Sequence, residues 1–336
     1  MKTPNSEPLY VYSWSSRGNL GDDWIHSVAS LVFENFTAVY EKRSPWLLGS
    51  HYLATRQNKR PKKGSRILLW GGGWLAGDQR NLRVYRRWSR HFHQNYKFFG
   101  FGLGIGPFHF FQAQWAWILS NIQQPIFVRC ESDEHSGIEF KTELAADVVF
   151  LDQRISGSTN VAKSGTVFSL ARYSAHWLDH NPSLTEVRYR ELVCEIQKSL
   201  SLLGPCTFVE FDSGGRRDSS DSNYWSFLDM PVLKPKTVED AFEIFQRAET
   251  VVASRLHAGI LGALVGAKVL ALSYHHKFES LREIGVEVID DFSVDSSTSS
   301  ISPRIANGAK IAEVRERAFA KLERLKVMMS LDSTID

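Results

Sequence analysis

Short apolar runs and longer amphipathic stretches alternate along most of the chain. The short runs predict buried strands, and the stretches in which apolar residues recur every three or four positions predict helices. This alternation is typical of a parallel α/β fold, because each helix returns the chain to the start of the next strand. We predict strands at residues 9–14, 66–70, 98–102, 126–129, 148–151, 166–171, 206–211, 250–253 and 269–273.

Helical periodicity fills the intervals between these strands. From residue 98 to residue 128 the chain has no Asp, Glu, Lys or Arg, and a segment without charges can indicate a membrane-spanning helix. Alternate glycines and Pro107 would break a helix there, so we predict a strand, a glycine-rich loop and an apolar helix instead. The other predicted helices cover residues 23–35, 80–94, 186–203, 238–248 and 311–329.

A polar stretch at residues 152–165 divides this pattern into two α/β series. The length of 336 residues also fits about two domains. We predict a first domain over residues 1–155, a second over residues 156–292, and a serine-rich loop with a closing helix over residues 293–336. Two such domains usually bind a ligand in the cleft between them, at the carboxyl ends of their strands.

Charge and cysteine usage narrow the class of protein. The chain has 40 basic and 37 acidic residues, a balance too even for a protein that coats nucleic acid. Its three cysteines lie far apart, without the spacing of a zinc or thiol-exchange site, which favours a reducing cytoplasm. The amino terminus lacks the apolar core of a signal peptide, so we expect a cytoplasmic protein. No histidine or acid cluster has metal-site spacing, so we expect no metal.

Glycines and polar side chains follow two of the predicted strands in the first domain. Asn19 and Asp22 come after the first strand, and a glycine triplet at residues 71–73 leads to Asp78. Such glycines can present backbone N–H groups to an anion, and Asp78 could take a proton from a hydroxyl. Both segments also fit plain turns, in which Asp22, Asp23 or Asp78 caps the following helix.

Basic side chains end two other strands. Arg129 ends one strand, where it could grip a carboxylate or phosphate or form a salt bridge with a neighbouring acid. Arg255 and His257 lie at a strand-to-helix corner, and a helix N-terminus favours phosphate. The glycine run at residues 100–107 matches neither the dinucleotide nor the Walker pattern, which argues against the nucleotide cofactors that use them.

These segments, taken in order, resemble the polysaccharide pyruvyl transferase family over residues 18–278. The matching stretches are residues 18–23, 71–78, 104–107, 128–132, Arg255-Leu256-His257, Tyr274 and Lys277. The resemblance implies an α/β, GT-B-like fold of two Rossmann-like domains facing across a cleft, with a C-terminal helix returning to the first domain. It implies transfer of the enolpyruvyl unit of phosphoenolpyruvate to two hydroxyls of one sugar, which forms a pyruvate ketal and releases phosphate without a cofactor.

The resemblance also implies roles for residues of this chain. The first domain would hold the acceptor glycan, and the second would hold phosphoenolpyruvate, whose carboxylate and phosphate two arginines can match. One departure is Cys130, which stands before Glu131 where the family has an acid directly after its Val-Arg. The implied catalytic residues are His257, Asp78 and Arg255, and the implied binding residues are Arg129, Leu256, Gly71, Gly72, Gly73, Asn19, Asp22, Tyr274 and Lys277.

Two other functions stay open at this point. A GT-B glycosyltransferase that uses a nucleotide sugar is the first, because Glu279 and Glu287 have the Glu-x7-Glu spacing of some retaining transferases. The alternation at residues 286–289, however, predicts that Glu287 lies on a strand. A glycan-binding protein without catalysis is the second, and it predicts that Arg129, Arg255 and His257 lie scattered.

The predicted helix at residues 80–94 carries a basic stripe. Arg80, Arg83, Arg87 and Arg90 fall on one face, and no acid interrupts them. A solvated surface is the ordinary explanation of such a stripe. The alternative is a peripheral contact with the inner face of the membrane, where a lipid-linked oligosaccharide acceptor would present its pyrophosphate.

Overall fold

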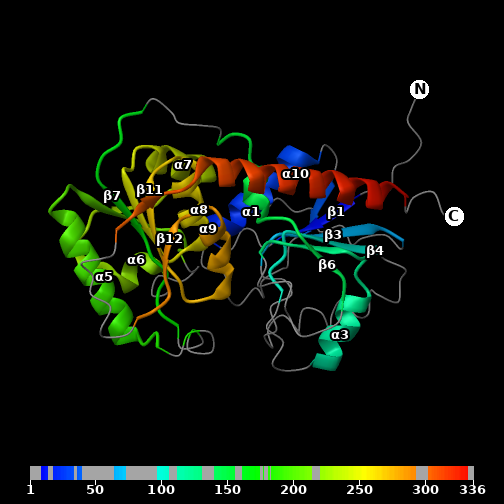
Figure 1. Ribbon diagram of the computed structural model, residues 1–336, viewed down its shortest axis with the longest axis horizontal. Coiled ribbons are helices and arrows are strands. Elements are labelled where there is room, and N and C mark those ends of the chain that lie inside the picture. Colours follow the sequence, from blue (N-terminus) through cyan, green and yellow to red (C-terminus); the bar gives the residue numbers. More distant parts are fainter. Residues whose placement is uncertain are drawn as a thin grey trace.

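The computed structural model describes residues 9–13, 18–33, 36–39, 64–72, 97–105, 112–130, 140–155, 161–174, 177, 181, 183–213, 220–292 and 302–331. Figure 1 shows two α/β halves side by side, with one long helix running along both. The basic stripe at residues 80–90 and the predicted site residues Gly73 and Asp78 lie outside the described residues.

The first half is built on a parallel sheet of four strands in the order β2-β1-β3-β4. A parallel pair, β5 and β6, continues it, because the bridge from Leu103 to Val128 joins the end of β4 to β5. The elements are β1 (Leu9–Tyr12), α1 (Leu20–Val32), β2 (Phe36–Val39), β3 (Arg66–Trp70), β4 (Lys97–Phe101), α3 (Gln112–Ser120), β5 (Ile126–Val128), β6 (Thr142–Leu144) and the 3-10 helix η2 (Val148–Leu151).

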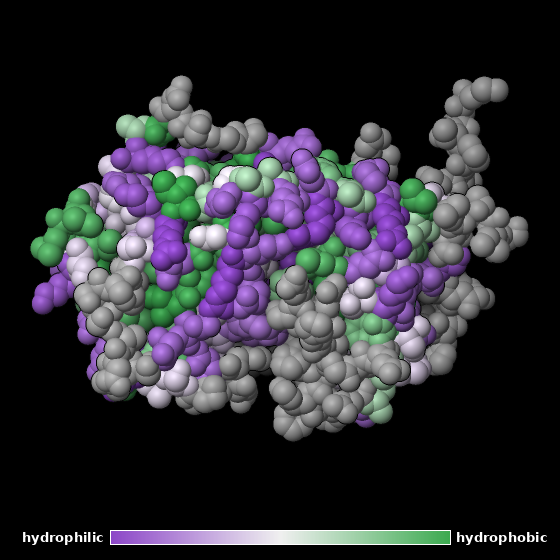
Figure 2. Space-filling view, viewed as in Figure 1, coloured by the Kyte–Doolittle hydropathy of each residue, from purple (hydrophilic) through white to green (hydrophobic). Residues whose placement is uncertain are grey.

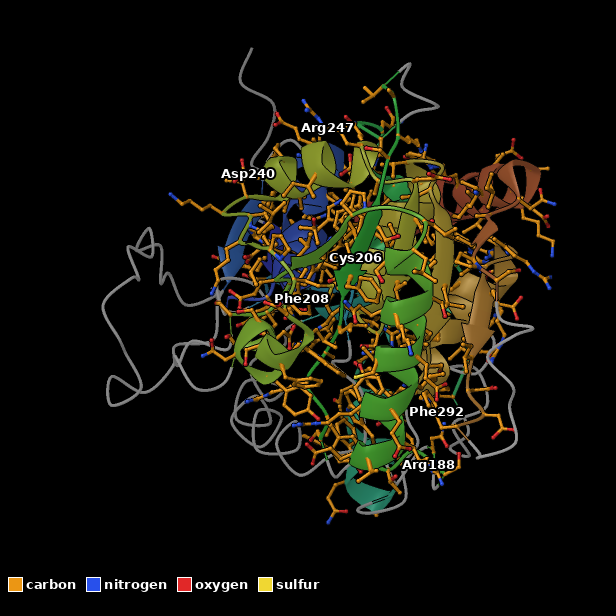
Figure 3. The ribbon with its side chains drawn as sticks, turned by 90° about the vertical axis from the view of Figure 1, so that its left-hand side faces the viewer. Arg188, Cys206, Phe208, Asp240, Arg247 and Phe292 are labelled. Carbon is orange, nitrogen blue, oxygen red and sulfur yellow. The ribbon has the colours of Figure 1, made fainter. Side chains whose placement is uncertain are left out.

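The second half has its own sheet, in the order β12-β11-β10-β7-β8-β9, with β13 antiparallel to β11. In Figure 3, Cys206 and Phe208 mark β8, Asp240 and Arg247 mark α7, and Arg188 marks α5. The elements are β7 (Thr166–Ser169), α5 (Glu186–Ser201), β8 (Cys206–Val209), α6 (Asp221–Tyr224), η5 (Ser226–Leu228), β9 (Val232–Leu233), α7 (Val238–Gln246), β10 (Thr250–Ala253), α8 (Leu256–Leu264), β11 (Lys268–Leu272), η6 (His276–Phe278), α9 (Glu279–Glu283), β12 (Glu287–Ile289), β13 (Arg304–Ile305) and α10 (Gly308–Leu331).

Helix α8 packs closely on the second sheet because its inner face is made of small residues. A Cβ atom at Gly262 would lie 2.9 Å from Val251 on β10, and one at Gly259 would lie 2.8 Å from Leu281. The sequence predicted this close approach from the Ala and Gly content of the helix. It places the first turn of α8 directly beyond the carboxyl end of β10.

Helix α10 joins the second half to the first. It lies along both halves in Figure 1, and its outward surface is largely hydrophilic in Figure 2. Lys321 and Arg324 pair with Glu143 on β6, and Arg66 on β3 donates to the carbonyl oxygen of Met329. The return of the C-terminal helix to the first domain is confirmed.

Two local predictions were wrong. Residues 148–151 form η2 and not a strand, because Asp147 accepts from the backbone N–H of Val149 and starts a helical turn. Helix α1 begins at Leu20 and not at residue 23, because Asn19, and neither Asp22 nor Asp23, accepts from the N–H of Gly21. In both cases a side-chain hydrogen bond at the cap sets where the helix starts, and the spacing of apolar residues does not reveal such a bond.

The apolar run at residues 98–128 contains β4, α3 and β5, as the glycine pattern predicted. Within the described ranges, no helix is both long enough and apolar enough to cross a bilayer.

Candidate active site

A cavity of about 200 Å³ opens between the two halves. Its lining residues follow the strands β1, β3, β4 and β5 of the first half and β8, β10 and β11 of the second. The expectation that polar residues beyond the strand ends meet in one cleft is therefore confirmed. The lining residues are Asn19, Asp22, Gly72, Gly104, Arg129, Phe211, Arg255, Leu256, His257, Tyr274, His275, His276 and Lys277.

Arg129 reaches this cavity from the end of β5. Its side chain is 6% exposed, and its Nη1 lies 4.0 Å from Oδ2 of Asp147. Gly104 makes room for the guanidinium, because a Cβ there would lie 2.4 Å from Nη2 of Arg129. The guanidinium of Arg129, after β5, thus occupies the space that the missing side chain of Gly104, after β4, leaves open.

His257 lies in the first turn of α8, against helix α1 of the other half. Its ring packs over Gly21, where a Cβ would lie 2.2 Å from Nδ1. The other ring nitrogen, Nε2, lies 3.4 Å from Oδ2 of Asp147. The edge of Trp24 meets the ring at a centroid distance of 6.4 Å. Both halves therefore hold this histidine.

Asp147 is a site residue that the sequence analysis missed. It is fully buried at 0% exposure, and its Oδ2 faces both His257 and Arg129. Burial alone would raise its pKa, but His257, Arg129 and the N–H of Val149 lower the pKa of Asp147 below its ordinary value. The available signal was an acid inside the apolar run at residues 144–151, since an acid is rarely buried without a partner.

Arg255 lies across the cavity in a different setting. Its Nε donates to Asp221 at 2.8 Å, and its Nη2 donates to Asp221 at 2.6 Å and to Asp212 at 3.0 Å. Burial would lower its pKa, but the two carboxylates raise the pKa of Arg255 above its usual range. Asp212 and Asp221 were not among the predicted site residues.

Two loops join the halves at the base of the cavity. Leu20 donates its backbone N–H to the carbonyl of Phe211 at 2.8 Å, and Ser213 donates to the carbonyl of Gly18 at 2.8 Å. Asn19 lies between them and caps α1 with its side chain, so this amide oxygen holds the loop as well as lining the cavity. The loop that follows β1 is therefore tied to the loop that follows β8.

Aromatic and basic side chains after β11 form another wall. Lys277 donates to the hydroxyl of Tyr274 at 2.7 Å, and the Tyr274 ring stacks on Trp177 at 3.8 Å. The adjacent His275 and His276, which we had not predicted as site residues, line the cavity too. These contacts hold the Lys277 side chain beside the cavity.

Gly71 serves a different purpose from the one predicted for the glycine triplet. Gly71 donates its N–H to the carbonyl of Phe101 at 2.8 Å, so this amide belongs to the sheet and not to an anion site. It also adopts a positive φ of 59°, which glycine tolerates best. Gly72 lines the cavity as expected.

Among the described residues, no three His, Cys, Asp or Glu side chains converge in a way that could hold a metal ion. Metal independence itself stays a prediction.

The family model of polysaccharide pyruvyl transferases matches residues 19–276, which include every lining residue except Lys277. The chain belongs to the polysaccharide pyruvyl transferase family. It is therefore an enzyme of polysaccharide pyruvylation. A comparison with curated proteins finds no match.

Solved structures support the GT-B-like fold and, at this low identity, the fold alone. Anabaena HepE, solved with UDP and glucose, has a TM-score of 0.52 and 11% identity over 98% of each chain. A Rickettsia africae glycosyltransferase has a TM-score of 0.52 and 10% identity over 99% of this chain and 100% of that one. The UDP-GlcNAc 2-epimerase of Methanocaldococcus jannaschii has a TM-score of 0.51 and 9% identity over 92% and 98%.

Proposed function

We propose that this enzyme transfers the pyruvyl unit of phosphoenolpyruvate to a sugar of a surface polysaccharide and forms a pyruvate ketal. One observation carries the proposal: Arg129, Arg255 and His257 converge on a single cavity from both halves of the molecule. A scaffold without catalysis would not need this convergence. Phosphoenolpyruvate carries two anionic groups, which suits a cavity lined by several cationic side chains.

The start of helix α8 is the proposed phosphate position. This helix of nine residues has no side-chain cap, so the N–H groups of its first turn are available to an anionic ligand. Leu256 and His257 lie in that turn, and both line the cavity. Arg129 and Lys277 then bind the donor carboxylate and the outer phosphate oxygens.

The chemistry conserves atoms and charge in a simple way. A proton adds to the methylene carbon of the donor, and a sugar hydroxyl attacks the neighbouring carbon, which has become electron-poor. The bond from that carbon to the phosphate oxygen breaks, and a second hydroxyl completes the ketal. Of the two hydroxyl protons, one replaces the proton given to the methyl group and the other leaves with phosphate. His257 handles the proton at the donor, and Asp78 is our candidate base for a hydroxyl.

The acceptor is a glycan or a lipid-linked oligosaccharide bound from the first half. We propose that phosphoenolpyruvate is the donor substrate and that no cofactor, metal or nucleic acid takes part. We propose that the enzyme is cytoplasmic, as its cysteine usage favours, and the basic stripe at residues 80–90 supports a peripheral contact with the inner membrane face. This part of the proposal rests on the sequence.

A nucleotide-sugar glycosyltransferase is the second candidate, favoured only by the shared fold. Its Glu-x7-Glu signature is not arranged as a site here. Glu287 lies on strand β12 and pairs with Arg304 at 3.0 Å, while Glu279 pairs with Arg282.

The test is phosphate release from phosphoenolpyruvate with a panel of β-galactosides, glucosides and N-acetylmannosamine glycosides, run with and without EDTA. We expect release that depends on the acceptor and survives EDTA, and that falls strongly in His257→Ala. Turnover of a UDP-sugar with no phosphate release from phosphoenolpyruvate would replace this function with the second candidate. Activity lost in EDTA and restored by a divalent ion would refute the metal-free scheme.

A further inference from the structure

Two buried acids flank the 3-10 helix η2, and they face different groups. Asp152, at its C-terminal end, accepts from the indole of Trp24 at 2.8 Å and from Arg154. Asp147, at its N-terminal end, uses Oδ1 to accept from the N–H of Val149, while Oδ2 faces His257 and Arg129. Both acids are 0% exposed, so only their partners distinguish them. Asp147 is the one whose partners line the cavity.

We propose that Asp147 is a positioning residue that sets the tautomer of His257, so that Nε2 carries the proton of the neutral ring and Nδ1 does not. A carboxylate only accepts hydrogen bonds, so the nitrogen beside it carries the proton of the neutral ring. Nε2 is that nitrogen, at 3.4 Å from Oδ2. Nδ1 then has a lone pair in the neutral ring and a proton to donate when the ring is charged.

The surroundings of the ring hold this orientation. Gly21 lies against Nδ1 at a distance that no Cβ would allow, and Trp24 meets the ring edge-on. A ring flip would bring a carbon atom to face Oδ2 in place of Nε2, so the buried carboxylate would lose its contact with the polar atom of the ring. One carboxylate from the first half therefore orients a histidine from the second.

The same oxygen also faces Arg129, which ends β5 in the first half. Asp147 is held ionised because the pKa of this carboxyl lies below its ordinary value. Its charge aligns two lining side chains from opposite halves at one point. This inference depends on the proposed function only for the activity assay, since the tautomer is a property of the protein alone.

Asp147→Asn is the decisive variant, because it changes the charge and one donor but not the shape. Asn is as good as Asp at a helix N-cap, so its oxygen should keep the N–H of Val149. Its amide nitrogen then takes the place of Oδ2 and donates to Nε2, which moves the ring proton to Nδ1. We expect kcat to fall by about 10²- to 10⁴-fold, as a wrong tautomer does in a serine-protease triad, while the Kd of phosphoenolpyruvate changes by less than about tenfold.

The direct readout is ¹⁵N NMR of the histidine ring in alkaline buffer, where histidines are neutral, with His257→Gln to assign the signal. The parent should show the proton on Nε2, and Asp147→Asn should show it on Nδ1. Asp152→Asn is the matched control: it loses stability, but it keeps the tautomer and a kcat within about threefold of the parent.

A proton on Nδ1 in the parent would overturn the proposal even if Asp147→Asn failed to fold. An unchanged tautomer or an unchanged kcat in a folded Asp147→Asn would overturn it as well. If the parent releases no phosphate from phosphoenolpyruvate while the tautomer still inverts in Asp147→Asn, the proposed function fails and the positioning role stands.

Discussion

The two arginines beside the cavity have opposite charge surroundings. Arg129 faces one buried carboxylate, Asp147, at 4.0 Å, and His257 shares that carboxylate. Arg255 donates three hydrogen bonds to two carboxylates, Asp212 and Asp221, at 2.6–3.0 Å. In the first group one carboxylate lies between an arginine and a histidine, whereas in the second one arginine lies between two carboxylates.

This difference indicates that two arginines that line one cavity, Arg129 and Arg255, can have different roles. The charge of Arg255 is already balanced within the protein, so we expect it to hold the corner from which α8 starts. Arg129 and Asp147 lie at the longer distance of 4.0 Å, so we expect an anionic donor to compete with Asp147 and to be drawn chiefly to that side. Pairing at a distance of 4.0 Å is weaker than direct bidentate pairing. Three variants test this contrast, and a fourth tests a carboxylate that is paired with two cations outside the cavity.

The largest effect should come from Arg129→Met, which keeps much of the side-chain volume and removes the charge. We expect kcat/KM for phosphoenolpyruvate to fall by about 10³-fold or more, because the donor loses a charged hydrogen-bonding partner in a buried site. Steady-state kinetics and a binding titration measure it. Arg188→Met, which alters an exposed arginine on α5, is the control. A loss of less than about tenfold would remove the contrast.

Arg255→Lys should have a mixed and smaller effect. An ammonium group cannot reproduce the three bonds to Asp212 and Asp221, so a buried carboxylate loses part of its pairing. We expect the free energy of unfolding to fall by about 2 kcal/mol and kcat/KM to fall by about 10- to 100-fold. Urea unfolding and kinetics on the same samples separate the two. A stable variant that binds phosphoenolpyruvate as weakly as Arg129→Met would show that both arginines grip the donor.

Gly104→Ala tests the placement of Arg129 without removing its charge. The new methyl group would overlap Nη2 of Arg129, the mobile end of a long side chain, so the guanidinium should shift while the fold stays intact. We expect KM for phosphoenolpyruvate to rise by about 3- to 30-fold, with a Tm within about 2 °C of the parent. Gly308→Ala on α10, where a Cβ meets nothing within 4 Å, is the control. An unchanged KM would show that the exact position of Arg129 is unimportant.

The smallest effect should lie outside the cavity, at another carboxylate shared by two cations. Burial would raise the pKa of Glu143, but Lys321 and Arg324 lower it below its ordinary value. Because the pKa of the folded state is lowered, the stabilisation is present above the unfolded pKa of about 4.3 and is lost as the pH falls through the folded pKa. We expect Glu143→Gln to cost about 1 kcal/mol at neutral pH and almost nothing near pH 2. Urea unfolding across this range measures the difference, and a cost that grows on acidification would contradict the pairing.

Individual strands and cavity residues show which parts of the structure could be predicted from the sequence. Strands β3 and β10 were predicted to the residue, because each is a buried apolar run bounded by polar positions. Arg129 after β5 and the Arg255–His257 corner after β10 were also predicted, since the carboxyl ends of parallel strands meet at one edge. After β11, Tyr274 and Lys277 were predicted but His275 and His276 were not. The predicted strand at 148–151 failed because four consecutive apolar residues fit a buried strand and a buried helical turn equally well.

The return of the final helix was implied by the family resemblance. By itself, the sequence determined the parallel α/β class and which loops supply Arg129, Arg255 and His257. These follow from periodicity and from glycine and small-residue positions, which are local properties of the chain. Only the tertiary structure decided what each of these side chains faces. Arg255 meets acids 34 and 43 positions away along the chain, and His257 meets one from the other half of the molecule. The charge around a buried group depends on what packing brings near it, because burial removes the water that would otherwise screen it.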